Sequence, residues 1–140
     1  MKINLIIMSL LILICSVYAG DKNIPDGTDG FSGMVTGEII KKEKNTLYVK
    51  IKEVKKLWKH NKAKKPNNLI GKTIKVNEGW HKPKGTKKYK PNKWHVNFIK
   101  KVKLGKVTLE IHTGDGDRFH LLELSHEQRK LAGVKQKKKD

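Results

Sequence analysis

The stretch that decides the fold is Met34–Ile51, which reads MVTGEIIKKEKNTLYVKI. In each half of it, alternate residues are apolar or glycine: Val35, Gly37, Ile39, Leu47, Val49 and Ile51. A period of two is typical of strands that bury one face, so this stretch predicts an antiparallel hairpin. We expect Ile39 opposite Leu47 and an odd-numbered connection around Glu43-Lys44-Asn45, because opposed residues point to the same side. Gly37, in mid-strand, indicates a bend or a close approach by another strand.

Three further strands are predicted downstream. Leu69–Val76, Lys106–His112 and Arg118–Leu124 alternate in the same way. We expect the last two to form a second hairpin with an odd connection, in which Glu110 lies opposite His120. Gly79–Lys93, between the third and fourth strands, is predicted to be a long irregular loop, and such loops are usually functional or mobile.

Helical signals occur in two places. His95–Leu104 carries apolar residues at helical spacing and is predicted to form a short helix or turn. Ser125 and Gln128 form a capping box, which predicts a helix that runs to about Ala132 and is ended by Gly133.

The fold class that follows is mainly β, with five short strands and a short C-terminal helix. Five strands with a glycine bend in the first resemble the OB-fold, a small partly open barrel, over roughly Met34–Leu124. The pattern is similar to that of small exported OB-like bacterial proteins. An SH3-like barrel or a small β-sandwich is the alternative architecture.

The two ends of the chain are expected to lie outside the barrel. Lys2 precedes the largely apolar run Leu5–Ile14, and small residues follow, as in a secretory signal peptide. We therefore expect cleavage near Ala19 or Gly20 and a periplasmic or extracellular protein. The expected organisation is a signal peptide (1–20), a flexible leader (21–33), an OB-like domain (34–133) and a basic tail (134–140).

The chain has a formal net charge of +19, and Lys55–Lys93 holds fourteen of its lysines against one acid, Glu78. Lysine is a hydrated point charge that suits diffuse attraction, whereas arginine makes two-pronged contacts, and only Arg118 and Arg129 are arginine. A genome-wide codon bias would also enrich lysine. It would favour glutamate too, and there are only seven.

The predicted ligand-binding residues combine this charge with aromatic rings. In the OB class, which this chain resembles, ligands usually lie across the second and third strands and the loops that flank them. Polyanion binding needs positive charge along a groove, and single-stranded nucleic acid also needs exposed rings on which bases stack. The predicted residues are Lys50, Lys52, Lys72, Lys75, Trp80, Lys82, Lys87, Lys88, Tyr89 and Trp94.

We expect no cofactor, no metal and no catalytic residue. No histidine spacing matches a known metal motif, and His112 and His120, if they approach each other, lack a clear third ligand. The sequence therefore predicts a non-enzymatic module that binds a polyanion, namely nucleic acid, acidic polysaccharide or an anionic membrane surface. The alternatives are an envelope accessory protein that binds another protein, and a hydrolase or lyase on an anionic polymer. The sequence does not indicate the oligomeric state.

Overall fold

The computed structural model describes residues 24–114 and 117–135 of the chain, so the predicted signal peptide and residues 136–140 of the tail lie outside it. The strands are β1 (Ser32–Glu43), β2 (Thr46–Leu57), β3 (Thr73–Asn77), β4 (Trp80–His81), β5 (Lys90–Pro91), β6 (Gly105–Thr113) and β7 (Phe119–Leu121). The helices are the 3₁₀ turn η1 (Pro66–Leu69), α2 (Lys93–Lys101) and α3 (His126–Ala132). No helix in these residues is long and apolar enough to cross a membrane.

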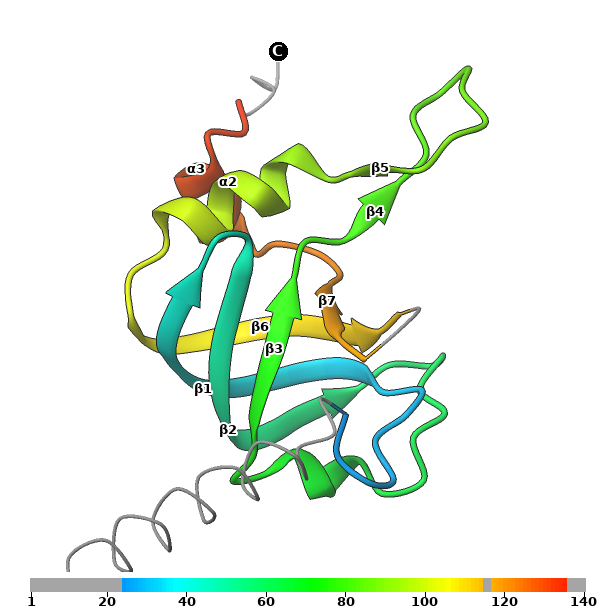
Figure 1. Ribbon diagram of the computed structural model, residues 1–140, viewed down its shortest axis with the longest axis vertical. Coiled ribbons are helices and arrows are strands. Elements are labelled where there is room, and N and C mark those ends of the chain that lie inside the picture. The colour runs from blue at the N-terminus through cyan, green and yellow to red at the C-terminus, as the bar shows by residue number, and fades with distance from the viewer. Residues whose placement is uncertain (1–23, 115–116, 136–140) are drawn as a thin grey trace, which may run out of the picture.

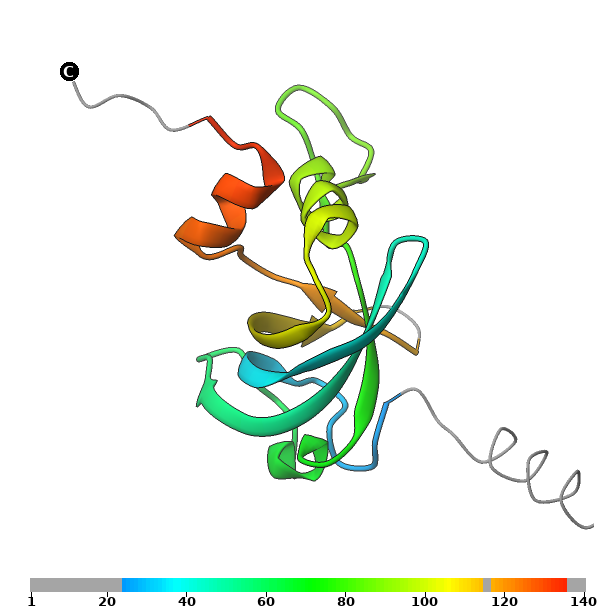
Figure 2. The same ribbon diagram turned by 90° about the vertical axis from the view of Figure 1, so that its left-hand side faces the viewer.

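Five of the strands close into a barrel in the order β1-β2-β3-β7-β6, with β6 returning to β1 (Figure 1). β3 and β7 pair in parallel, and the other neighbours pair antiparallel. Helix α2 lies between β3 and β6 in the chain and packs at one end of the barrel beside α3 (Figure 2). The predicted fold class, a five-stranded OB-like barrel with a short C-terminal helix, is confirmed.

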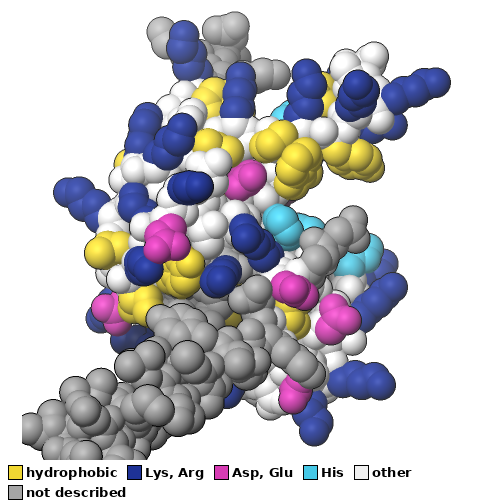
Figure 3. Space-filling view, viewed as in Figure 1, with side chains coloured by type: hydrophobic (Ala, Val, Ile, Leu, Met, Phe, Trp, Pro, Cys, Tyr) yellow, Lys and Arg dark blue, Asp and Glu magenta, His cyan; other side chains and the backbone are white. Residues whose placement is uncertain are grey.

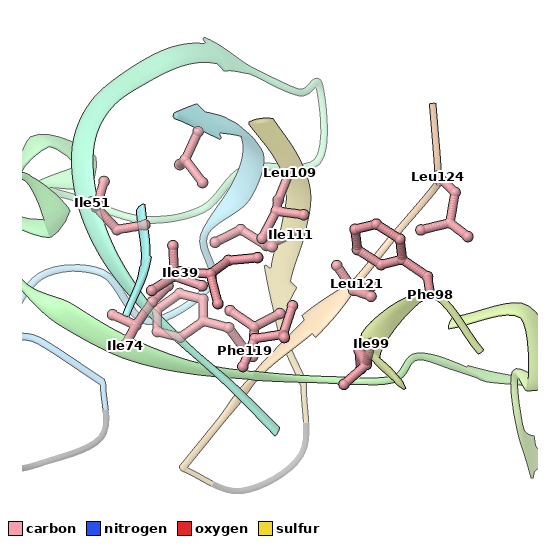
Figure 4. Packing of buried hydrophobic residues seen from close by; sticks show 14 of the residues in the cluster. Ile39, Ile51, Ile74, Phe98, Ile99, Leu109, Ile111, Phe119, Leu121 and Leu124 are labelled. Carbon is pink, nitrogen blue, oxygen red and sulfur yellow. The ribbon is translucent and has the colours of Figure 1, made fainter. Parts of the chain in front are cut away.

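The core fills the barrel with side chains from every strand of it (Figure 4). Ile39, Ile51 and Ile74 are each 1% exposed, and Phe119 is fully buried against Phe31, whose ring meets it edge-on. Phe98 and Ile99 from α2 extend the same cluster out of the barrel end (Figure 4). Helix α2 is therefore fixed to the barrel by its apolar face, and it positions the segment that precedes it.

The first hairpin has the predicted inward residues but a different connection. Glu43 pairs with Thr46, so the turn holds two residues, Lys44 and Asn45, and Lys44 takes the positive φ of 49°. The parity of the two buried faces is restored by a register shift between Ile39 and Lys41, so that Ile39 pairs with Val49. The expected odd connection is wrong, because a β-bulge supplies the extra residue.

Gly37 has the close approach that its position predicted. An added Cβ there would lie 2.4 Å from the backbone oxygen of Lys50, and the register shifts again beside it. Glycine is required because the neighbouring strand leaves no room for a side chain.

The second hairpin has the predicted odd connection, but its register differs by two residues. Ile111 pairs with Leu121 and Thr113 with Phe119, so His112 faces His120. Glu110, expected opposite His120, lies two residues before His112 on β6. The shift brings the two imidazole rings together, with centroids 6.0 Å apart.

Two boundaries and the leader also differ from expectation. Strand β2 continues to Leu57, and Leu69 belongs to the 3₁₀ turn before β3. The leader was expected to be flexible, yet Phe31 is 1% exposed and Thr28 is buried. The backbone N–H groups of Lys62 and Lys65 donate to the carbonyl oxygens of Gly30 and Gly27, and these hydrogen bonds hold residues 24–31.

Both helices have well-defined ends. Asn92 caps α2 through its side-chain oxygen, and the Ser125–Gln128 capping box with left-handed Gly133 bounds α3 as predicted. The C-terminal end of α2 is met by Lys42 of β1, whose Nζ donates to the carbonyl oxygens of Ile99, Lys100 and Val102 at 3.1, 3.0 and 2.7 Å. Those carbonyls lack helical partners, so the ammonium group satisfies them and favours the negative end of the helix.

Candidate functional site

A cleft of about 790 Å³ opens on one side of the barrel, next to the ends of β6 and β7. Its lining comes from three separate parts of the chain: Asp29, Trp80, Tyr89, His112, Thr113, Gly114 and His120. Figure 3 shows this hollow, with hydrophobic side chains on one wall and histidines on the other. It combines exposed rings with hydrogen-bonding groups, as small-molecule and polymer sites commonly do.

One wall of the cleft is the β4–β5 ribbon, a two-stranded excursion within the segment predicted to be an irregular loop. Trp80 pairs with Pro91 and His81 with Lys90, and the chain between them forms a turn around Pro83 and Thr86. Trp80 is 56% exposed and Tyr89 is 66% exposed. Rings of this size are usually buried, so two of them at one cleft form an accessible stacking surface.

His95 of α2 anchors the base of this ribbon. The Gly79 N–H donates to His95 Nδ1 at 2.9 Å, and the Asn92 N–H donates to the Gly79 oxygen at 2.8 Å. His95 is only 5% exposed, and this burial lowers its pKa from 6.5 to about 4, against an opposing hydrogen bond to the Leu122 backbone. The imidazole is therefore neutral near pH 7, as a ring that accepts from an N–H must be.

The opposite wall is the His112–His120 pair on β6 and β7. His120 Nδ1 lies 2.8 Å from the Glu78 backbone oxygen, and His112 Nδ1 lies 3.1 Å from the Thr113 oxygen. A carbonyl oxygen can only accept, so each Nδ1 carries the proton in the neutral ring, and each Nε2 carries a lone pair. Burial lowers the pKa of His112, as does His120 to a smaller extent.

The segment before β1 supplies Asp29 to the lining of the cleft. The Gly30 N–H donates to Thr113 Oγ1 at 2.8 Å, and the Thr113 N–H donates to the Phe31 oxygen at 3.0 Å. These bonds hold the segment that carries Asp29, which lines the cleft together with the two histidines. Among the described residues of the lining, Asp29 is the one acidic group.

A basic surface adjoins the cleft across β3 and β2. Asn77 pairs with His120, and its side-chain oxygen accepts from Arg118 at 3.3 Å. Asn77 is itself nearly buried and donates to the Asn45 oxygen and to Thr46 Oγ1. The guanidinium of Arg118 is therefore held in place at the strand end, and a held guanidinium suits two-pronged contact with phosphate.

Tyr48 extends this surface along β2. Its ring lies under the ammonium groups of Lys41 and Lys75, at 5.2 and 5.7 Å from the ring centre. Its hydroxyl donates to Glu43 at 2.9 Å, and this hydrogen bond raises the pKa of Tyr48.

The residues predicted from the sequence are distributed over several places. Trp80 and Tyr89 line the cleft, and the exposed Lys82, Lys87 and Lys88 lie on the β4–β5 excursion beside them. Lys75 belongs to the surface around Tyr48, while Lys50 and Lys72 are exposed on and next to the strands. Lys52 pairs with Glu38 at 3.5 Å and lines a separate hollow of about 330 Å³ with Lys106.

Trp94 lies elsewhere than the predicted site. It is half-buried on α2, packs against the core and lies under the Lys93 ammonium group at 4.7 Å from the ring centre. Seven residues of the cleft and its basic surround were not among those predicted: Asp29, Tyr48, His112, Thr113, Gly114, Arg118 and His120. For two of these a signal existed, since His112 and His120 flank the predicted second turn.

The described part of the chain contains no group of three or more histidine, cysteine or acidic side chains arranged to hold a metal ion. Comparison with protein-family models, with curated proteins and with solved structures gave no match. What the site can do chemically therefore follows from its own residues.

Proposed function

We propose that this protein is an exported, non-enzymatic module that binds a single-stranded polyanion, with nucleic acid as the preferred class. Export is inferred from the signal-peptide pattern of the first twenty residues. Its sequence pattern resembles that of small exported OB-like proteins, and in the OB class ligands usually cross the second and third strands and the adjoining loops.

The observation that carries the proposal is the pair of exposed rings in a basic surround. Trp80 and Tyr89 are both more than half exposed in one cleft. Stacking of a base on such a ring contributes about 1–3 kcal/mol and is indifferent to sequence. In their neutral form the imidazoles on the facing wall offer acceptors to base edges, which single-stranded nucleic acid presents and a flat anionic membrane does not.

The charges next to the cleft supply the other requirement, contact with the phosphate backbone. Lys82, Lys87 and Lys88 extend from the ribbon on one side, and Arg118 and Lys75 lie on the barrel on the other. A strand whose bases enter the cleft would have phosphates within reach of both. Lysines release counterions from such a strand, so affinity should fall steeply as salt rises.

The test is anisotropy with a fluorescent single-stranded oligonucleotide over a salt series. Trp80→Ala should weaken binding roughly 5- to 150-fold, the equivalent of about 1–3 kcal/mol, and Trp80→Phe should restore most of it. The triple change of Lys82, Lys87 and Lys88 to Gln should lower the slope of log affinity against log salt by about 0.7 for each phosphate that is no longer neutralised.

A triple change of the exposed Lys59, Lys64 and Lys103 to Gln is the matched control, because it removes the same charge from residues that neither line the cleft nor belong to the ribbon. If this control weakens binding as much as the ribbon variant, binding is diffuse and the cleft is not the site. Competition with a heparin-like polymer and with anionic vesicles separates the ligand classes. A protein that binds neither DNA nor RNA single strands at low salt would refute the proposal.

A further inference from the structure

The His112–His120 pair places two imidazole rings side by side in the cleft. The Nδ1 atom of each ring is bound to a backbone carbonyl, at 3.1 Å for His112 and 2.8 Å for His120. In the neutral ring this contact fixes the tautomer, with the proton on Nδ1 and the lone pair on Nε2. Metal-binding histidines have the same arrangement, since a backbone carbonyl that accepts from one ring nitrogen orients the other toward the ion.

The spacing of the two rings suits one shared ion. Their centroids are 6.0 Å apart and their planes are tilted by 45°. With metal–nitrogen bonds of about 2.1 Å, two imidazoles on one ion have centroids roughly 4.5 to 6.4 Å apart as the N–metal–N angle widens from about 90° to 180°, and the observed spacing lies toward the wide end of this range. The pair is held at this distance because the residues are direct partners on adjacent antiparallel strands.

The chain also leaves room at the nitrogen of His120 that would bind. Gly114 lies against that edge of the ring, and an added Cβ there would be 2.5 Å from Cδ2 and 3.0 Å from Nε2 of His120. A side chain at position 114 would crowd this edge of the ring or displace it. Both histidines line the open cleft, and Asp29 at its rim adds a negative charge that favours a cation.

We propose that His112 and His120 together bind one late divalent transition-metal ion of the Zn²⁺, Ni²⁺ or Cu²⁺ class through their Nε2 atoms. Imidazole suits these metals, whereas Mg²⁺ and Ca²⁺ require oxygen ligands. Among the described residues two protein ligands are grouped here, so the remaining coordination positions can be taken by water or by an anionic ligand in the cleft. No metal was expected from the sequence because a third ligand was missing, and an open two-histidine site does not need one.

The experiment is calorimetric titration of the full, untagged chain with Zn²⁺ and with Ni²⁺ at pH 7.5 in a non-coordinating buffer. One ion should bind per chain. His112→Ala and His120→Ala should each weaken binding at least tenfold, because each removes half of the protein ligands. His60→Ala and His81→Ala are matched controls, since both residues are exposed and neither lines the cleft. These controls should bind as the unmodified protein does.

Gly114→Ala is the sharper variant because it keeps both histidines. Its methyl group would stand against Nε2 of His120, so it too should weaken binding at least tenfold. Two-bond ¹H–¹⁵N spectra of the unmodified protein need no variant. They should show both Nε2 atoms without a proton at pH 7.5, and both should shift together when Zn²⁺ is added.

Several results would overturn the proposal. These are no binding by the unmodified protein up to millimolar Zn²⁺, a Zn²⁺-induced shift of only one of the two imidazoles, or equal losses in the His60 and cleft variants. Unchanged binding in any of the three cleft variants would do the same. If a histidine variant fails to fold, the spectra of the unmodified protein and Gly114→Ala still decide. None of these results depends on whether the protein binds nucleic acid.

Discussion

Replacing His95 with asparagine should remove a pH-dependent part of the stability of this protein. In the folded state the ring is 5% exposed and accepts a hydrogen bond from the Gly79 N–H, and burial lowers its pKa from 6.5 to about 4. In the unfolded chain it titrates near its ordinary value. Between these two pKa values the unfolded state binds more protons, so acid favours unfolding.

The sign and size follow from the two pKa values. The contribution of His95 to the free energy of unfolding is fully present above pH 6.5 and is lost progressively as the pH falls toward 4. Each pKa unit corresponds to 1.36 kcal/mol, so the whole loss is about 3 kcal/mol, of which about 2 kcal/mol is lost between pH 8 and pH 5. His95→Asn keeps an acceptor for Gly79 but does not titrate, so this part of the pH dependence should disappear.

The assay is urea unfolding of both proteins at pH 8 and pH 5, followed by far-ultraviolet circular dichroism. The variant will be less stable at pH 8, since a smaller side chain leaves a cavity, but its loss between the two pH values should be about 2 kcal/mol smaller than that of the unmodified protein. Groups common to both proteins, including His112, cancel in this difference. Equal losses in the two proteins would refute the conclusion that the fold holds His95 neutral.

Three further changes test individual contacts by urea unfolding at pH 7. Lys42→Met should cost about 2 kcal/mol, since hydrogen bonds from a charged group to otherwise unpaired carbonyls are lost, while Lys84→Met at the exposed ribbon turn should change stability by less than about 0.5 kcal/mol. Gly37→Ala should cost at least about 2 kcal/mol, because its methyl group would stand 2.4 Å from a backbone oxygen that cannot move without breaking the β1–β2 pairing. Ser125→Ala should cost about 1 kcal/mol through loss of the α3 cap, and a neutral result would mean that tertiary contacts alone hold this helix.

The features predicted best from the sequence are those set by local chemistry. The capping box at Ser125 and the left-handed Gly133 follow from side-chain and backbone preferences within one turn. The inward faces of the strands follow from a period of two, and Gly37 marks a close approach whatever the partner. The OB-like barrel followed because five alternating stretches of this length have few ways to bury one face each.

The features that escaped prediction depend on where strands meet. A two-residue turn at Lys44 combined with a bulge after Ile39 buries the same alternate residues as an odd-numbered connection without a bulge. The alternation alone therefore did not distinguish these two structures. The second hairpin keeps the same inward faces when its register shifts by two residues. That shift decides whether His120 faces Glu110 or His112, and therefore whether two imidazoles meet at the wall of the cleft.

The distribution of charge along the sequence was a poor guide to the position of the cleft. The predicted lysines are spread over the ribbon, two strand faces and a second hollow, since a lysine is tolerated wherever its ammonium group reaches water. The exposed Trp80 and Tyr89 are more informative, because an exposed ring of this size is uncommon in a small domain whose other aromatic rings are largely buried. The polarity of the neighbouring residues does not show which tryptophan is exposed. The neighbours of Trp94 in sequence are as polar as those of Trp80, yet Trp94 packs on the core.

We expect the lysines and the residues of fixed geometry to contribute differently to recognition. A closed barrel pairs all five of its strands with one another, so a partner cannot join that sheet as an extra strand and must be recognised by side chains. On the proposed function, the exposed lysines of the ribbon would attract any polyanion and discriminate little among them. Discrimination must then come from groups with fixed geometry: the stacking rings, the two oriented imidazoles and the guanidinium that Asn77 holds. Changes to the lysines should therefore alter affinity for all polyanions together, whereas changes to Trp80, His120 or Arg118 should alter the ranking among them.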